Sequence, residues 1–225
     1  MNDTTTILFG TLLPFFLTSA GSAMVFFFRE KSSVLAQRLF LGFAAGVMVA
    51  ASVWGLLIPA IEEAEASGGI GWIPAAGGFV LGAAVLMLLD TFLPHIHPAS
   101  GEAEGLPSSW RRTTLMVSAV TLHNIPEGMA VGLSLALAVQ RNDSAALTAA
   151  LALSLGIGIQ NFPEGAAVSL PLRQDGMGRF KAFVYGSLSG VVEPIFGLLT
   201  VLFAVSLTPV MPWLLSFAAG AMVYV

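Results

Sequence analysis

Two short polar motifs interrupt long apolar stretches of this chain, and their residue types suit a cation. The first, HNIPEG, covers residues 123–128, and the second, QNFPEG, covers residues 160–165. In each motif one polar residue stands four positions before a glutamate and an asparagine three before it, so on a helix the three side chains share a face. Ionisable side chains are costly inside a membrane and by default indicate a functional site there.

The two motifs supply an imidazole, two carboxylates and three amides. These candidate ligands are His123, Asn124, Glu127, Gln160, Asn161 and Glu164. The proline in each motif lacks a backbone N–H and crowds the carbonyl group four residues earlier, that of Leu122 or Ile159. We therefore expect a kink at each proline, with additional carbonyl oxygens exposed toward a cation.

The composition places both motifs in a membrane protein. Of the 225 residues, 56% are hydrophobic and only 10% are charged, against about a quarter charged in a soluble domain. Cysteine is absent, which excludes disulfides and thiolate metal sites. The nine basic residues are scattered at the ends of apolar runs, so nucleic acid is not an expected partner. The sequence predicts an all-α polytopic membrane protein whose partner is the lipid bilayer.

The apolar runs predict six full transmembrane helices and a partial seventh within a single domain of residues 1–225. They lie near residues 5–28, 34–61, 70–93, 113–139, 145–171, 182–207 and 210–225. The first run lacks the preceding basic segment of a cleavable signal peptide, so we expect it to remain in the protein as a transmembrane span. Because the seventh run stops at Val225, we expect the rest of that span and an eighth span in a complete protein.

The basic residues predict the orientation of the chain. Eight of the nine fall on one side of the predicted spans, and only Arg141 falls on the other. By the positive-inside rule that side is the cytoplasm, so the N-terminus is expected outside a plasma or inner membrane. Glu62, Glu63 and Glu65 are then expected to form a solvated outer rim.

Two internal sequence similarities predict an inverted repeat, which is a transporter architecture. HNIPEG and QNFPEG lie on the fourth and fifth spans, which run in opposite directions. Residues 41–51 (LGFAAGVMVAA) of the second span match residues 215–225 (LSFAAGAMVYV) of the seventh at seven of eleven positions. Small residues four apart also predict close helix contacts. They are Gly42 with Gly46, Gly78 with Gly82, Gly128 with Gly132, and Gly186 with Gly190.

The estimated depth in the membrane places two further residues at the level of the motifs. At about 1.5 Å per helical residue, His123, Glu164, Glu193 and Met48 each lie about 13–18 Å from the nearest cytoplasmic basic residue. Three glutamates close together in a low dielectric need positive charge between them. Imidazole, carboxylate and thioether donors suit Zn²⁺ and its neighbours. Met48 could instead fill the core, and Glu193 could pair with a neighbouring helix.

The paired motifs on adjacent spans resemble those of the ZIP family (Zrt- and Irt-like proteins) of zinc and iron transporters. The resemblance implies eight spans, homodimers, and alternating-access transport toward the cytoplasm of Zn²⁺, with Cd²⁺, Fe²⁺ or Mn²⁺ as further substrates. It also implies metal ligands on four spans and two adjacent metal positions that Glu164 bridges. Asn161 stands where some bacterial relatives carry aspartate. The neutral asparagine lowers the negative charge of the second metal position.

The loop of residues 94–109 carries a second candidate metal site. His95 and His97 lie in it and Asp90 just before it, on the predicted cytoplasmic side. The corresponding family loop is histidine-rich, which implies a patch for metal exit or sensing. Two solvated loop histidines are an equal alternative, because a pair of surface histidines binds weakly without a third fixed ligand.

Two other functional classes compete with transport. A membrane metalloenzyme would need a motif such as H-E-x-x-H or G-x-S-x-G, and the chain has neither. We therefore predict that the protein is not an enzyme. The remaining alternative is a metal-binding membrane protein that does not transport, which the short seventh run favours.

Overall fold

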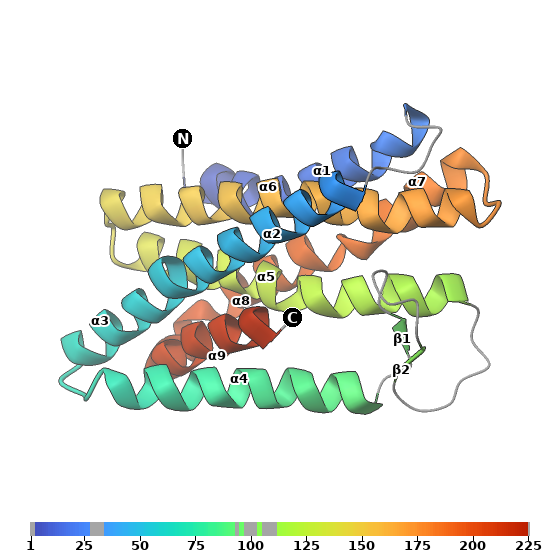
Figure 1. Cartoon of the computed structure of the whole chain (residues 1–225). Helices are drawn as coiled ribbons and strands as arrows, with labels where there is room; N and C mark the ends of the chain where they lie inside the picture. The colour runs from blue at the N-terminus through green and yellow to red at the C-terminus, as the bar shows by residue number, and fades with distance from the viewer. Residues whose placement is uncertain (1–2, 28–33, 93–94, 97–102, 105–111, 225) are drawn as a thin grey trace.

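The computed structural model describes residues 3–27, 34–92, 95–96, 103–104 and 112–224. In chain order its elements are α1 Asp3–Ser22, the 3₁₀ turn η1 Ala23–Phe26, α2 Val34–Ala50, the π-helix η2 Ala51–Leu57, α3 Ile58–Ala66, α4 Trp72–Phe92, β1 His95–Ile96, β2 Ala103–Glu104, α5 Arg112–Gln140, α6 Ser144–Gln174, α7 Arg179–Ser189, α8 Val192–Leu207, the 3₁₀ turn η3 Thr208–Val210 and α9 Met211–Tyr224. Figure 1 shows these helices lying roughly alongside one another, with α2 and α3 crossing the others obliquely.

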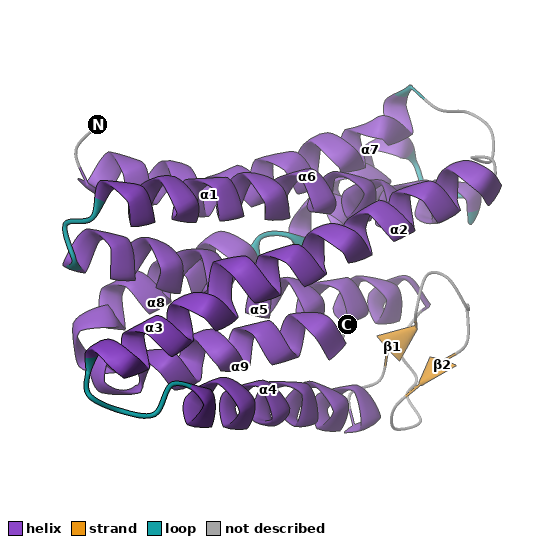
Figure 2. Ribbon diagram, turned by 60° about the vertical axis from the view of Figure 1, so that its left-hand side comes forward, coloured by secondary structure: helices purple, strands orange, loops and turns teal. Residues whose placement is uncertain are grey.

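The predicted fold class is confirmed. Six helical stretches are long and apolar enough to cross a membrane, and the shorter apolar stretch Thr208–Tyr224 follows them. Each predicted span overlaps one of these stretches. The two short strands form one antiparallel pair in which His95 is opposite Glu104, within the region predicted as a loop (Figure 2).

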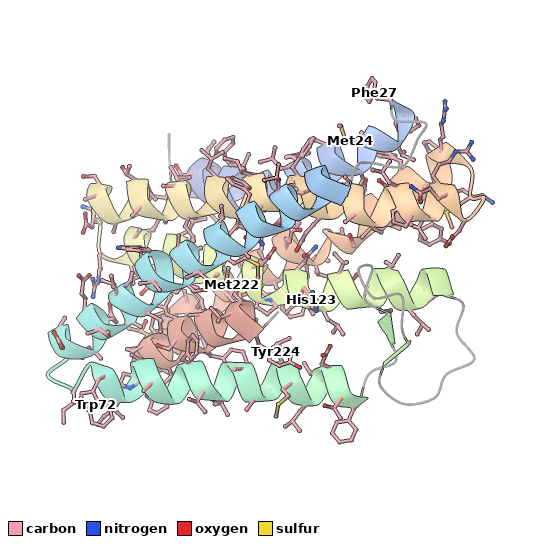
Figure 3. The ribbon with its side chains drawn as sticks, viewed as in Figure 1. Met24, Phe27, Trp72, His123, Met222 and Tyr224 are labelled. Carbon is pink, nitrogen blue, oxygen red and sulfur yellow. The ribbon has the colours of Figure 1, made fainter. Side chains whose placement is uncertain are left out.

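The two ends of the bundle are marked by exposed aromatic side chains. Trp72, 68% exposed, lies at the end that carries the turn between α3 and α4. Phe27, 78% exposed, lies toward the opposite end (Figure 3). Tryptophan is enriched at membrane–water interfaces, so the position of Trp72 agrees with a bundle that spans a bilayer. At the Trp72 end, Arg141 forms an ion pair with Glu63 and so joins α3 to the turn between α5 and α6.

Three helix pairs make the most extensive contacts: α1 with α6, α4 with α9, and α5 with α8. In each pair the backbones touch at glycine. A β-carbon on Gly165 would overlap the carbonyl oxygen of Thr18, and one on Gly82 would overlap that of Phe217. Small residues allow helices this close approach, and dispersion contacts between the backbones then stabilise the bundle.

The predicted close contact is not seen for one glycine pair within the described part of the chain. No described atom lies within 4 Å of where a β-carbon on Gly42 or Gly46 would stand, and both residues are exposed. Helix α2 instead contacts α6, and the π-helix that follows it contacts α9. The face that carries the two glycines is therefore not the face that packs against the described helices.

The pairing of helices agrees with the predicted inverted repeat. The repeat would relate the first span (α1) to the sixth (α7 and α8), and the fourth span (α5) to the fifth (α6). Packing of α1 on α6 then corresponds to packing of α8 on α5. Both contacts are extensive. The polar motifs of α5 and α6 thus each lie against one helix of the other repeat.

The motifs lie between two apolar clusters. The larger cluster includes Leu56, Leu133, Ile157 and Leu215, and it occupies the part of the bundle between the motifs and the end that carries Arg141. The smaller cluster includes Val120 and Leu172 on the opposite side of the motifs. The polar residues are therefore enclosed by packed apolar side chains along the bundle axis.

Candidate metal centre

A hydrogen bond joins the two motifs across helices α5 and α6. The side-chain nitrogen of Gln160 donates to Oε1 of Glu127 over 2.5 Å. Gln160 is completely buried and Glu127 is 1% exposed. Burial of a carboxylate requires hydrogen bonds or opposite charge, and Gln160 supplies one such bond. The two predicted ligands thus contact each other directly.

The sixth span is broken where it passes the motifs. Helix α7 ends at Ser189 and α8 begins at Val192, so Glu193 lies in the first turn of α8. Pro194 explains the break, because proline lacks an N–H and crowds the carbonyl group four residues earlier, here that of Gly190. The predicted kinks at Pro126 and Pro163 do not break their helices, since α5 and α6 continue through both prolines.

The broken span places two polar groups against the motifs. A helix end leaves carbonyl groups without partners, and the Ser189 carbonyl accepts a hydrogen bond from the side-chain nitrogen of Asn124 over 3.1 Å. Glu193 is 1% exposed, and its Oε1 accepts a hydrogen bond from the hydroxyl group of Thr18 over 3.0 Å. Thr18 lies on α1, a helix from which the sequence predicted no site residue. A threonine in an apolar span carries no sequence signal that separates it from a packing residue.

Four of these side chains share one arrangement, in which one polar atom is hydrogen-bonded and the other has no partner among the described residues. The unpaired atoms are Asn124 Oδ1, Glu127 Oε2, Gln160 Oε1 and Glu193 Oε2. Both polar atoms of Asn161, Oδ1 and Nδ2, and Oε2 of Glu164 are also buried without a partner in the described structure. Nearly all buried polar atoms in proteins are hydrogen-bonded, so six unpaired oxygens on neighbouring side chains need an explanation.

The same side chains form an electrostatically unfavourable cluster. Glu127 lies near both Glu164 and Glu193, so the three side chains would repel one another if all were ionised, and the Asn161 side chain lies near both Glu127 and Glu193. Ionised carboxylates in low dielectric require a nearby positive charge. In the described parts of the chain, no three His, Asp or Glu side chains form a ready-made metal cluster. A metal ion here would therefore need the amide oxygens in its coordination as well.

Two further candidate ligands occupy less enclosed positions. His123 is half-buried and lies in the middle part of the bundle on α5, one helical turn before Glu127 (Figure 3). Met48 is half-buried, lies near the end of α2, and packs against the larger apolar cluster. Its position suits core packing, and metal ligation by Met48 stays a prediction.

The candidate cytoplasmic patch is only partly described. The carboxylate of Asp90 accepts a hydrogen bond from the hydroxyl group of Tyr224 over 3.1 Å, which joins α4 to α9. His97 lies outside the described residues, and only the backbone pairing of His95 is described. Metal binding by this patch stays a prediction.

A surface hollow near the QNFPEG motif lacks metal donors. It has a volume of about 300 Å³ and an apolar lining of Leu17, Phe43, Ile159, Phe162 and Pro163. Phe162 and Pro163 thus face this hollow, whereas the neighbouring Asn161 is completely buried. The polar side of the motif and its apolar side therefore lie on different faces of α6.

Comparison with known proteins identifies the family. The model of the ZIP zinc transporter family matches residues 102–225, which include both motifs and the broken span. The chain is 38% identical to zinc transporter ZIP11 of Homo sapiens over 97% of this chain and 86% of that protein. The chain belongs to the ZIP family. It is also 36% identical to zinc transporter GufA of Myxococcus xanthus over 97% of the chain and 84% of the relative. It shares 36% identity with zinc transporter ZIPB of Bordetella bronchiseptica, over 94% of this chain and 67% of that protein.

Membership of the ZIP family settles the class of protein. The chain is a multi-pass transmembrane protein of a metal-ion transporter family, which is the recognition that the paired motifs predicted. Relatives that are transporters favour the predicted non-enzymatic role.

Proposed function

We propose that this protein carries Zn²⁺ across the membrane toward the cytoplasm through the cluster that the two motifs form with Glu193. The observation that carries the proposal is the group of six buried oxygens without partners on side chains of α5, α6 and α8. A cation bound among these side chains would give unpaired oxygens a partner and would offset the repulsion among ionised glutamates. Zinc is the ion named for the ZIP11, GufA and ZIPB relatives.

The donor types determine which ions could bind. Carboxylate and amide oxygens alone suit Mg²⁺ or Ca²⁺, whereas addition of an imidazole favours Zn²⁺ and similar ions. His123 lies one helical turn from Glu127 and would supply that imidazole. We propose Cd²⁺, Fe²⁺ and Mn²⁺ as further substrates, with Glu164 bridging two adjacent ion positions when both are filled.

The hydrogen bonds around the cluster would prepare it for the ion. Gln160 holds one oxygen of Glu127, and the Ser189 carbonyl holds the amide nitrogen of Asn124. In each residue the other polar atom is an oxygen that stays available for coordination. Partners of this kind orient metal ligands, and their loss typically weakens affinity about 10- to 100-fold.

The two apolar clusters suggest how access would alternate. The larger cluster lies between the site and the end that carries Arg141, which the positive-inside rule places outside. An ion from outside could reach the site only after these side chains separate. We propose that α1, α5, α6 and α8 move together relative to α3, α4 and α9, so that the site faces each side in turn. The pair of Arg141 and Glu63 joins these two groups at the outer end.

Location and assembly complete the proposal. The distribution of basic residues supports an orientation with the N-terminus outside, and we propose a plasma or inner membrane location. Formation of homodimers rests on the family resemblance alone.

The decisive experiment is Zn²⁺ flux into proteoliposomes that contain the 225-residue chain, with Glu164→Ala and Glu62→Ala compared at equal protein density. Glu62 is an exposed glutamate at the outer end of α3 and serves as the matched control. Flux that disappears in Glu164→Ala and persists in Glu62→Ala would support the proposal. Equal flux in both variants would refute the site, and zinc binding without flux in the unmodified chain would establish binding without transport.

A further inference from the structure

Helix α1 contributes a buried hydroxyl group to the metal centre. Thr18 is completely buried, and its Oγ1 lies 3.0 Å from Oε1 of Glu193 and 3.1 Å from the carbonyl oxygen of Pro14. Glu193 is 175 positions away in the sequence, so only the packing of α1 near α8 creates this contact. The hydroxyl group thus reaches a carboxylate of the cluster from α1.

The hydroxyl proton can serve only one of the two acceptors at a time, because threonine carries a single donor hydrogen. In a helix the Pro14 carbonyl already accepts the backbone N–H four residues later, which is that of Thr18 itself. An ionised carboxylate is also the stronger acceptor, since charge-assisted hydrogen bonds are about twice as strong as neutral ones. The hydroxyl group of Thr18 is therefore expected to donate to Glu193 when that carboxylate is charged.

The surrounding backbone leaves Glu193 little freedom to turn. A β-carbon on Gly190 would lie 2.8 Å from Oε1 of Glu193 and 2.9 Å from Cγ2 of Thr18. On the other side, a β-carbon on Gly128 of the HNIPEG motif would overlap the backbone of Glu193. Glu193 is thus enclosed between α1 and α5, with Oε1 on Thr18 and Oε2 without a partner in the described structure.

We infer that Thr18 is a positioning residue, which binds one oxygen of Glu193 and thereby aims the other oxygen at the transported cation. The inference rests on the proposed function, since it assigns the orientation of one ligand of that site. Thr18 would contact no metal itself. It acts in the same way as the hydrogen-bond partners that orient ligands in other metal sites.

Two substitutions separate the hydroxyl group from the rest of the side chain. Thr18→Val keeps the shape and removes the donor, whereas Thr18→Ser keeps the donor and removes the methyl group. In the 225-residue chain, purified in detergent and titrated with Zn²⁺, we expect Thr18→Val to raise Kd about 10-fold or more. We expect Thr18→Ser to stay within about twofold of the unmodified chain.

Thr11 provides the matched control. It is a second buried threonine of α1, 2% exposed, and its hydroxyl group bonds only to carbonyl groups of its own helix, those of Ile7 and Leu8. Thr11→Val should leave Kd unchanged. A loss of affinity in Thr11→Val equal to that in Thr18→Val would show a general effect on α1 and overturn the inference.

The Glu193→Gln background tests whether Thr18 acts through Glu193. If it does, Thr18→Val adds no further loss of affinity to Glu193→Gln. An undiminished effect in that background, or a Thr18→Ser variant as weak as Thr18→Val, would overturn the inference while leaving the proposed function intact. Absence of saturable zinc binding in the unmodified chain would overturn both.

Discussion

The side-chain nitrogen of Gln160 lies 2.5 Å from Oε1 of Glu127, so the two motifs meet through a hydrogen bond between two predicted ligands. Gln160 also stands four positions before Glu164, on the same helical face as the glutamate of its own motif. In the fold it instead holds the glutamate of the other motif. Each of the two residues then keeps one oxygen without a partner among the described residues.

This bond predicts that Gln160 affects zinc affinity through Glu127 as well as through its own oxygen. Gln160→Leu removes both, so we expect Kd for Zn²⁺ to rise about 10-fold or more. The measurement is a zinc titration of the purified protein. Gln174→Leu is the control, because Gln174 is exposed at the end of α6. The zinc affinity of this variant should equal that of the unmodified chain. Equal affinities in both variants would remove Gln160 from the site.

Acid is expected to weaken zinc binding. Carboxylates and imidazole bind metal in their deprotonated forms, so protons compete with Zn²⁺ for Glu127, Glu164, Glu193 and His123. Lowering the pH from 7 to 5 should therefore raise Kd by at least about 10-fold, and return to pH 7 should restore it. The measurement is equilibrium zinc binding at both pH values, with circular dichroism to verify that the helices persist. A Kd that does not change with pH would contradict a site of carboxylates and imidazole.

Glycine contacts between helices predict where a methyl group is not tolerated. A β-carbon on Gly82 would overlap the carbonyl oxygen of Phe217, so Gly82→Ala must push α4 away from α9. Overpacking of this kind typically lowers the free energy of unfolding by about 1–3 kcal/mol. Gly156→Ala is the control, because the nearest atom to its β-carbon would be Val47 Cγ1 at 3.7 Å, an ordinary contact. Thermal unfolding in detergent compares the two, and equal stabilities would contradict the close packing of α4 on α9.

The predicted orientation can be tested by labelling, because the chain contains no cysteine that would interfere. Ser67 is exposed at the end of α3, on the side of Arg141, and Gln174 is exposed at the opposite end of α6. In intact cells a membrane-impermeant maleimide should label Ser67→Cys, and it should label Gln174→Cys only after permeabilisation. The reverse pattern would place the N-terminus inside.

The burial of several candidate site residues could be predicted because the strongest signals are local. Asn124, Glu127, Gln160, Asn161 and Glu193 were all expected from polar residues inside apolar runs, and the structure buries all five. Counting about 1.5 Å per helical residue from the basic residues placed Glu193 at the same depth as His123, Glu164 and Met48. Depth along a helix axis follows from sequence, because the helical rise per residue is constant.

The contacts between helices followed only from the tertiary structure. The sequence by itself determined that the chain spans a membrane, that α5 and α6 carry polar motifs, and that Glu193 reaches their depth. Only the fold decided that Gln160 holds Glu127, that Thr18 holds Glu193, and that Gly42 and Gly46 face away from the described helices. The physical reason is that hydropathy and helical period describe one helix at a time. Which faces meet depends on how closely whole helices can pack, and backbone contacts at residues such as Gly128 and Gly165 determine that.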